Sequence, residues 1–237
     1  MCGIVGYVGP KDATPIIING LKRLEYRGYD SAGVAVINNG EIDVRRDAGK
    51  LQQLVDLLSR SPLTGAPGIG HTRWATHGAP SARNAHPHVG NTSKMVVVHN
   101  GIVENFLELK EELGAEGVTF NSETDTETIV HLAEHNKAAG ISFEEAARRT
   151  FKQIEGANVV LLLSTDEPDK IIAARIGNAG GIVVGLGEGE NYLASDIPAI
   201  LEHTRRMIFL ESRQMVVLTK DSVRIETIDG EEVKPEI

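Results

Sequence analysis

Short apolar runs separated by turn residues dominate the hydrophobic pattern of this chain. The runs are rich in β-branched residues and are bounded by glycine, asparagine, aspartate or proline, which is typical of β-strands. They predict strands at residues 4–8, 33–37, 95–99, 158–163, 170–174, 182–186, 207–210 and 215–218. Asn39-Gly40 predicts a tight hairpin after the second run, because both residue types accept the positive φ of a two-residue turn. Asp229-Gly230 predicts another hairpin.

A second pattern, with apolar residues three or four positions apart, predicts amphipathic helices. The stretches are residues 14–25, 51–58, 104–113, 126–139 and 146–154. Asp125 is the predicted N-cap of the fourth, since aspartate is a preferred capping residue. Ser142 and Glu145 form a capping-box pattern before the fifth.

The order of these elements predicts an α+β fold. Helices come in clusters instead of alternating with strands, which argues against a parallel sheet. Several strands are apolar at successive positions, which indicates cover on both faces. We therefore expect two antiparallel sheets stacked between two helix layers, in one domain over residues 1–228. The polar residues 229–237 are expected to begin a linker, or to fray.

Composition narrows the function classes. The chain has 237 residues, and its formal net charge is 24 − 33 = −9, which argues against nucleic-acid or membrane-surface partners. No apolar run approaches the roughly 20 residues needed to span a bilayer, and no signal peptide is evident. The single cysteine excludes an intrachain disulfide and a cysteine-built zinc site, and it predicts a reducing compartment, the cytoplasm.

That cysteine is at position 2. Its small side chain favours removal of Met1, which would leave a thiol and a free α-amine on one residue. An α-amine has a pKa of about 7.7–8.0 and can act as a base near neutral pH. This is the arrangement of an N-terminal nucleophile. The alternative is that Cys2 only permits removal of the methionine.

A dense polar cluster, HTRWATHG, occupies residues 71–78. Arg73 is suited to hold a carboxylate through two parallel hydrogen bonds, and Thr76 and His77 add donors. The alternative is a surface loop in which Trp74 stacks on the arginine.

Further candidates follow a strand and flank two helices. Asn100 and the Gly101 N–H could donate to one oxygen, as an oxyanion hole does, or they could form a plain Asn-Gly turn. Asp125 could pair with a ligand ammonium as well as cap its helix. Arg27 could lie beside the site and Tyr29 could line it, or both could simply end the first helix.

Two other patterns do not support a cofactor. His86 and His88 flank a proline with no nearby carboxylate or cysteine, which is not a usual zinc arrangement. The glycine-rich residues 185–190 lack the dinucleotide and P-loop patterns and are interpreted as turns. We expect no metal and no cofactor.

The ordered motifs MCGIVG, RGYDS, HTRWATHG, HNG and SETD resemble the class II glutamine amidotransferases, an N-terminal nucleophile family. LEYRGYDSAG, HTRWATHG and SETDTE resemble most closely the hexosamine branch, the glutaminase half of the glucosamine-6-phosphate synthases (glutamine–fructose-6-phosphate aminotransferases). The likeness covers nearly the whole chain. It implies an α-β-β-α sandwich, which agrees with the pattern above.

The resemblance also implies site roles. Cys2 would attack the side-chain amide of L-glutamine, pass through a glutamyl thioester and release ammonia. Asn100 and Gly101 would hold the oxyanion, and Arg27 would orient the terminus or the oxyanion site. The resemblance assigns substrate binding to Arg73, Trp74, Thr76, His77 and Asp125, with Trp74 in a loop that closes over glutamine.

Two departures and two alternatives accompany the resemblance. The family continues into sugar-isomerase domains and dimerises largely through them, so we expect this chain to be a glutaminase domain that in a full-length protein would have its own isomerase domain and a second subunit as partners. The oligomeric state of the chain itself is left open. Residues 178–181 differ from the family pattern and are expected to be structural.

One alternative is an amidophosphoribosyltransferase, whose branch has Tyr-Ser where this chain has Trp74-Ala75. The other is a glutamine-binding module without turnover.

Overall fold

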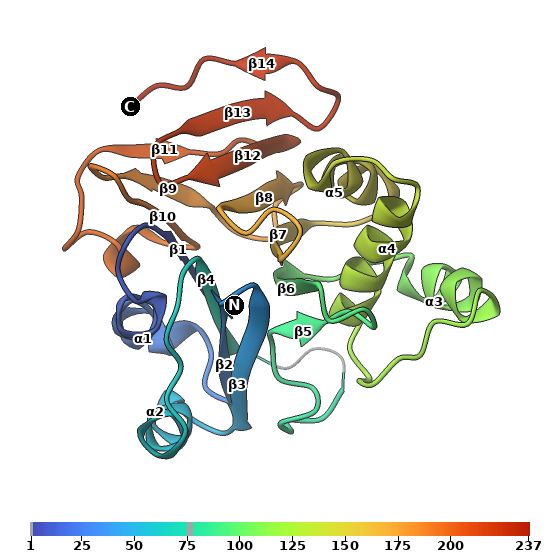
Figure 1. Cartoon of the computed structure of the whole chain (residues 1–237), viewed down its shortest axis with the longest axis horizontal. Coiled ribbons are helices and arrows are strands. Elements are labelled where there is room, and N and C mark those ends of the chain that lie inside the picture. Colours follow the sequence, from blue (N-terminus) through green and yellow to red (C-terminus); the bar gives the residue numbers. More distant parts are fainter. Residues whose placement is uncertain (1, 75–77) are drawn as a thin grey trace.

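Two stacked antiparallel sheets form the centre of the molecule (Figure 1). The structure is a computed structural model that describes residues 2–74 and 78–237. Within these residues each sheet has seven strands. The first has the order β11 (Met207–Phe209), β9 (Val183–Leu186), β10 (Asn191–Ala194), β1 (Gly3–Val8), β4 (Gly68–Arg73), β2 (Ser31–Asn38), β3 (Glu41–Ala48). The second has the order β14 (Glu232–Val233), β13 (Val223–Thr227), β12 (Gln214–Thr219), β8 (Lys170–Ile176), β7 (Asn158–Ser164), β6 (Met95–Gly101), β5 (His88–Val89).

Helices cover the outer faces of both sheets. α1 (Ala13–Arg23) and α2 (Leu51–Arg60) pack on the first sheet. α4 (Thr126–Ala138) and α5 (Phe143–Gln153) pack on the second, with α3 (Phe106–Ala115) beside α4. Two short 3-10 helices, η1 (Glu25–Arg27) and η2 (Ile197–Ala199), complete the described elements. None of the helices in the described ranges is both long and apolar enough to cross a bilayer.

Three apolar clusters hold the four layers together. One lies between the sheets, and the other two lie between each sheet and its helices. β7 shows why a strand can be apolar at successive positions, here residues 159–163: Leu161 packs between the sheets, whereas its neighbour Leu162 packs against the helices. The structure therefore confirms the predicted α+β sandwich.

The local predictions are confirmed in most places. Asn39 and Gly40 have φ of 51° and 82°, as the predicted hairpin turn between β2 and β3 requires. The hydroxyl of Ser142 accepts a 3.1 Å hydrogen bond from the backbone N–H of Glu145, as in a capping box. At the C-terminus, Glu232 and Val233 still pair with β13 as an edge strand. The predicted boundary at residue 228 therefore falls inside a hairpin.

β4 is one of the strands that the hydrophobic pattern missed; β5 and β10 are others. The outer positions of β4 include Gly68 and Gly70, so the apolar alternation is broken. Both glycines face α1, where an added Cβ would clash with Ala13 or Ile17. Close approach of the helix is thus the reason for the glycines. As a correction to the loop interpretation, His71 and the two residues after it belong to this strand.

Strand β1 anchors the N-terminal end of the chain. It lies between β10 and β4, and its Ile4 is opposite His71. The backbone N–H of Ile4 donates to the Ser195 hydroxyl at 3.0 Å, and the Ser195 N–H donates to the Ile4 carbonyl at 3.0 Å. Cys2 precedes this paired strand directly, so its position is set by the sheet.

Candidate active site

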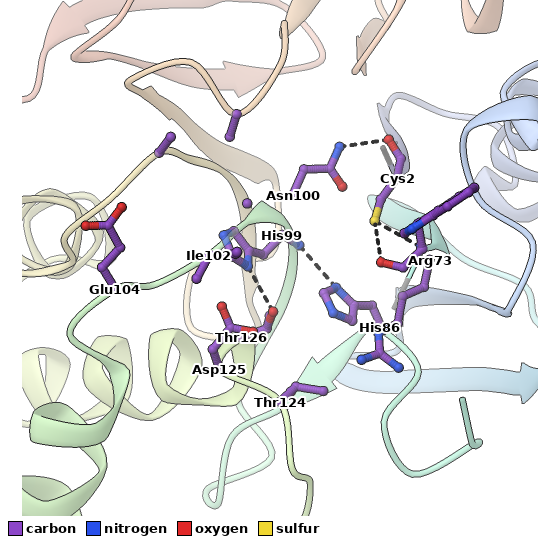
Figure 2. Close-up of a pocket in the computed structure, with 14 residues that line it drawn as sticks. Cys2, Arg73, His86, His99, Asn100, Ile102, Glu104, Thr124, Asp125 and Thr126 are labelled. Carbon is purple, nitrogen blue, oxygen red and sulfur yellow. Dashed lines mark hydrogen bonds between the residues drawn. The ribbon is translucent and has the colours of Figure 1, made fainter. Parts of the chain in front are cut away.

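A pocket of about 390 Å³ opens beside Cys2, where the ends of the two sheets meet (Figure 2). The first sheet contributes Cys2 and Arg73, and the second contributes Asn100. Asp125 reaches it from the start of α4. The described lining residues are Cys2, Arg73, Trp74, His86, His99, Asn100, Gly101, Ile102, Glu104, Thr124, Asp125, Thr126, Ala157 and Ala179.

The thiol of Cys2 contacts the backbone of one residue, Trp74. Its Sγ accepts a hydrogen bond from the Trp74 backbone N–H at 3.1 Å and lies 3.6 Å from the Trp74 carbonyl oxygen. Burial raises the pKa of the Cys2 thiol, although the Trp74 N–H opposes that shift. A thiol with a raised pKa needs a base to become a nucleophile. An α-amine on the same residue would be the nearest base.

Asn100 joins the nucleophile to the second sheet. Its Nδ2 donates to the Cys2 carbonyl oxygen at 3.0 Å (Figure 2), and the amide nitrogen carries a second hydrogen for a ligand. Its Oδ1 lies 3.0 Å from Nε2 of His71. Gly101 follows with a φ of 130°, and an added Cβ would overlap the carbonyl oxygen of Ala157. Only glycine fits this position. Asn100 and Gly101 are the last two residues of β6 and line the pocket, so the alternative of a plain Asn-Gly turn is wrong.

Arg73 is buried at the end of β4. Its Nη2 donates to the Gly78 carbonyl oxygen at 3.0 Å, so the end of β4 is connected to the first residue described after the 75–77 segment. Two predicted substrate-binding residues in that segment, Thr76 and His77, lie outside the described residues. Trp74 is 48% exposed and packs edge-on against Tyr29, with ring centroids 5.5 Å apart. Tyr29 is outside the described pocket lining and supports the Trp74 ring instead.

Asp125 is buried and directed into the pocket. Its Oδ2 accepts a hydrogen bond from the Val103 backbone N–H at 2.8 Å. Asp125 occupies the N-cap position of α4, as predicted, but its side chain makes no hydrogen bond to the first turn of that helix. The carboxylate of Glu127 instead accepts the backbone N–H groups of Asn121 and Ser122, at 2.7 and 2.6 Å. Burial by itself would raise the pKa of Glu127. These two hydrogen bonds, together with the one to His131, outweigh burial and lower the pKa to about 2.

Arg27 does not line the pocket, but it contacts a residue that is bonded to strand β1. Its guanidinium pairs with Asp196 and donates to the Ser195 carbonyl oxygen at 3.4 Å. Ser195 in turn bonds Ile4 of β1. The structure thus places Arg27 behind the N-terminal strand, where it can orient the terminus without touching a ligand. Its role stays a prediction.

Four buried histidines form a cluster at the pocket: His86 and His99 line it, whereas His71 and His88 are outside its lining. The rings of His71 and His86 stack with centroids 4.1 Å apart, and His88 meets His86 edge-on at 4.9 Å. Burial lowers the pKa of each histidine, to about 3 for His71 and His88, so the rings are neutral near pH 7. His99 connects Thr126 and Asn158, at 2.9 Å each. Within residues 2–74 and 78–237, no three His, Cys, Asp or Glu side chains gather as a metal site would require.

These histidines predict acid sensitivity. In the unfolded chain each takes up a proton below about pH 6.5, whereas in the folded chain it stays neutral to a lower pH. The unfolded state therefore binds more protons, and the free energy of unfolding falls as the pH falls. We expect a loss of about 1.4 kcal/mol per pH unit per histidine between pH 6 and 4.5, measured by urea unfolding.

A matched pair of variants tests the source of this slope. His88→Gln should reduce the slope by about one proton, because one buried histidine is gone. His135→Gln is the matched control, because it replaces a histidine whose side chain is 46% exposed and lies 2.8 Å from Glu116, outside the buried cluster. An identical slope in the His88→Gln variant and in the parent would contradict the assignment.

Sequence reasoning missed several lining residues. Ile102 and Glu104 follow Gly101 directly, and their closeness along the chain was the available signal. Ala157 directly precedes β7 and reaches the pocket because β7 pairs with β6. Its local sequence does not indicate this position. Ala179 lies in the segment that was expected to be purely structural, and it also lines the pocket.

The sequence comparisons identify related proteins. A family model described as "Glutamine amidotransferase domain" matches residues 71–202. The glutamine–fructose-6-phosphate aminotransferase (isomerizing) of Thermococcus kodakarensis is 50% identical over 98% of this chain and 38% of its own length. The protein of the same name from Aquifex aeolicus is 50% identical over 100% of this chain and 39% of its own length. The chain thus spans well under half of these curated relatives.

Solved structures show the same fold. The Bacillus subtilis glutamine phosphoribosylpyrophosphate amidotransferase matches 96% of this chain and 49% of its own, with a TM-score of 0.82 and 22% identity. A glutamine aminotransferase class-II domain protein from Silicibacter pomeroyi matches 96% of this chain, with a TM-score of 0.64 and 14% identity. At these identities the likeness concerns the fold alone.

Proposed function

The chain belongs to the glutamine amidotransferase domain family, and on that premise we propose that it hydrolyses the side-chain amide of L-glutamine to glutamate and ammonia. One observation carries the proposal: a single pocket brings together a thiol, an amide donor, a buried guanidinium and a buried carboxylate. These are Cys2, Asn100, Arg73 and Asp125. Binding alone would not require the thiol, which disfavours the non-catalytic alternative.

The proposed reaction has two halves. Sγ of Cys2 bonds to the amide carbon while the thiol proton passes to the Cys2 α-amine and on to the departing nitrogen. The C–N bond breaks, ammonia leaves and a glutamyl thioester remains. Water then attacks the thioester, the C–S bond breaks and the thiol regains its proton. Asn100 Nδ2 and the Gly101 N–H would stabilise the oxyanion of both steps, and each such donor is worth about 10²–10³ in kcat.

Charge would orient the glutamine. Arg73 and Asp125 approach the pocket from opposite sides (Figure 2), as the α-carboxylate and the α-ammonium of an amino acid require. Thr76 and His77 would assist Arg73, and Trp74 would cover the bound molecule. These three contacts are inferred from the resemblance.

The Asp125→Asn variant tests this orientation. Asparagine keeps the shape and can still accept from the Val103 N–H, but it removes the negative charge. A charge-assisted hydrogen bond contributes about 1.5–3 kcal/mol, so we expect KM for L-glutamine to rise about 10- to 100-fold. The kcat should change only a few-fold, because the α-ammonium is remote from the reacting amide. Ammonia release at varied glutamine concentration measures both.

The control is Asp169→Asn. Asp169 lies in the turn between β7 and β8, near Val8 at the opposite end of β1 from Cys2, so the variant changes net charge without touching the pocket. Its KM should match that of the parent. An unchanged KM in Asp125→Asn would remove Asp125 from the binding site.

We also propose a destination for the ammonia. The curated relatives are named glutamine–fructose-6-phosphate aminotransferases, and this chain covers about 38% of their length. In a protein of that length, ammonia would serve glucosamine-6-phosphate formation from fructose-6-phosphate in the protein's own isomerase domain, with a second subunit. Location in the cytoplasm and the absence of nucleic-acid and membrane partners remain predictions from composition.

The encoded sequence after residue 237 discriminates the acceptors. Sugar-isomerase repeats there would support the proposal, whereas a phosphoribosyl-binding motif would favour an amidophosphoribosyltransferase. The relatives at 50% identity favour the first outcome, because the phosphoribosylpyrophosphate enzyme reaches only 22%.

A further inference from the structure

His71 makes two hydrogen bonds that connect the sheets. It lies on β4 of the first sheet, and its Nε2 is 3.0 Å from the His99 carbonyl oxygen and 3.0 Å from Oδ1 of Asn100, both on β6 of the second. Both partners are acceptors, so Nε2 must carry the hydrogen. The amide orientation is consistent, because Nδ2 of Asn100 donates to the Cys2 carbonyl oxygen.

The other ring nitrogen of His71, Nδ1, forms no hydrogen bond with the described residues. The His71 side chain is fully buried. A hydrogen on Nδ1 would be a buried donor without an acceptor, which further favours the Nε2–H tautomer. The stacked His86 ring, 4.1 Å away and inclined by 18°, holds the plane of the imidazole. Burial lowers the pKa of His71 to about 3, so the ring stays neutral.

The hydrogen on Nε2 of His71 determines how the Asn100 amide is oriented. An amide side chain can rotate by half a turn and exchange its oxygen and nitrogen at little steric cost. In the exchanged orientation Oδ1 would face the Cys2 carbonyl oxygen and the developing oxyanion, and it would repel both. Among the described residues, the Nε2–H of His71 is the contact that distinguishes the two orientations from the Oδ1 side.

We propose that His71 is a positioning residue: its Nε2–H fixes the Asn100 amide so that Nδ2 faces the reacting carbonyl. The inference rests on the proposed function, because it assigns Asn100 to the oxyanion. His71 itself touches no substrate. The same hydrogen bonds also connect the sheet that carries the nucleophile to the sheet that carries the oxyanion donor.

A matched pair of substitutions separates this donor from simple filling of space. In His71→Gln the side-chain Nε2 can reach the same acceptors, whereas His71→Met has a similar size and no donor. We expect His71→Met to lower kcat for L-glutamine about 10- to 100-fold, with KM within about threefold of the parent. We expect His71→Gln to retain kcat within about fivefold. Equal losses in the two variants, or full activity in His71→Met, would overturn the proposal.

A double-variant cycle tests whether the effect passes through Asn100. Asn100→Ala should lower kcat about 10²–10³-fold, and adding His71→Met should lower it by less than about twofold more. Multiplicative losses would overturn the proposal. Nitrogen-15 NMR of the parent imidazole is independent of how the variants fold: a proton on Nδ1 instead of Nε2 would also overturn it. Failure of the proposed function would look different, as a parent chain that releases no ammonia.

Discussion

Replacing Cys2 by alanine is expected to abolish ammonia release from L-glutamine, with kcat falling by at least about 10⁴-fold. The substitution removes the atom that would form the thioester, and the remaining oxyanion and binding contacts supply only a residual rate. The fold should persist, since the thiol's hydrogen bonds are to the backbone of Trp74 alone and β1 begins at the next residue. Ammonia assay and thermal unfolding of the same preparation check both expectations.

The serine variant is the matched control for this prediction. Cys2→Ser keeps the size and a hydroxyl that can bond the Trp74 peptide, but it offers a far weaker nucleophile. It should unfold at the temperature of the parent and lose most of the activity. Should Cys2→Ala release ammonia as fast as the parent, thioester chemistry at this residue is excluded.

The second large effect is expected from any residue retained before Cys2. With Met1 in place the α-nitrogen of Cys2 is a peptide nitrogen and cannot take up the thiol proton. General base catalysis contributes about 10²–10⁴-fold, and burial of the thiol leaves little thiolate to compensate. We therefore expect at least about a 10²-fold lower kcat when Met1 or an N-terminal tag remains.

Two preparations of the same chain make the comparison. One keeps an N-terminal tag, and the other has the tag cleaved so that Cys2 is the first residue; intact mass verifies each. A chain with the tag at its C-terminus shows whether tagging alone matters. Equal rates in the tagged and cleaved forms would mean that the base is another group, and the α-amine would lose its proposed role.

The sequence predicted most elements because their signals are local. Asn39-Gly40 specifies its own turn, and Ser142 caps its own helix through Glu145. Such features depend on backbone preferences within a few residues, which the pattern displays directly. The site residues whose roles follow from a family resemblance could also be named in advance, Cys2 first among them.

The misses have a common physical origin in contacts between distant segments. The hydrophobic pattern did not predict β4 because Gly68 and Gly70 interrupt it. These glycines allow the close approach of α1, and no local sequence pattern indicates that contact. Asp125 was expected to cap its own helix, but its carboxylate accepts from Val103, 22 positions away. A hydrogen bond of that span depends on how α4 packs against β6, so sequence reasoning could not find it.

The pocket shows most clearly which features follow from the sequence and which follow from the tertiary structure. By itself the sequence determined the chemistry available: one thiol at position 2, an amide beside a glycine, an arginine and an aspartate. The tertiary structure alone decided that these groups meet, because Cys2 extends from one sheet and Asn100 from the other, and only the stacking of the sheets brings them within 3.0 Å. It also decided the part played by His71, whose two acceptors lie across the gap between the sheets. Side-chain types are written in the chain, whereas distances between strands that never pair arise from packing of the whole core.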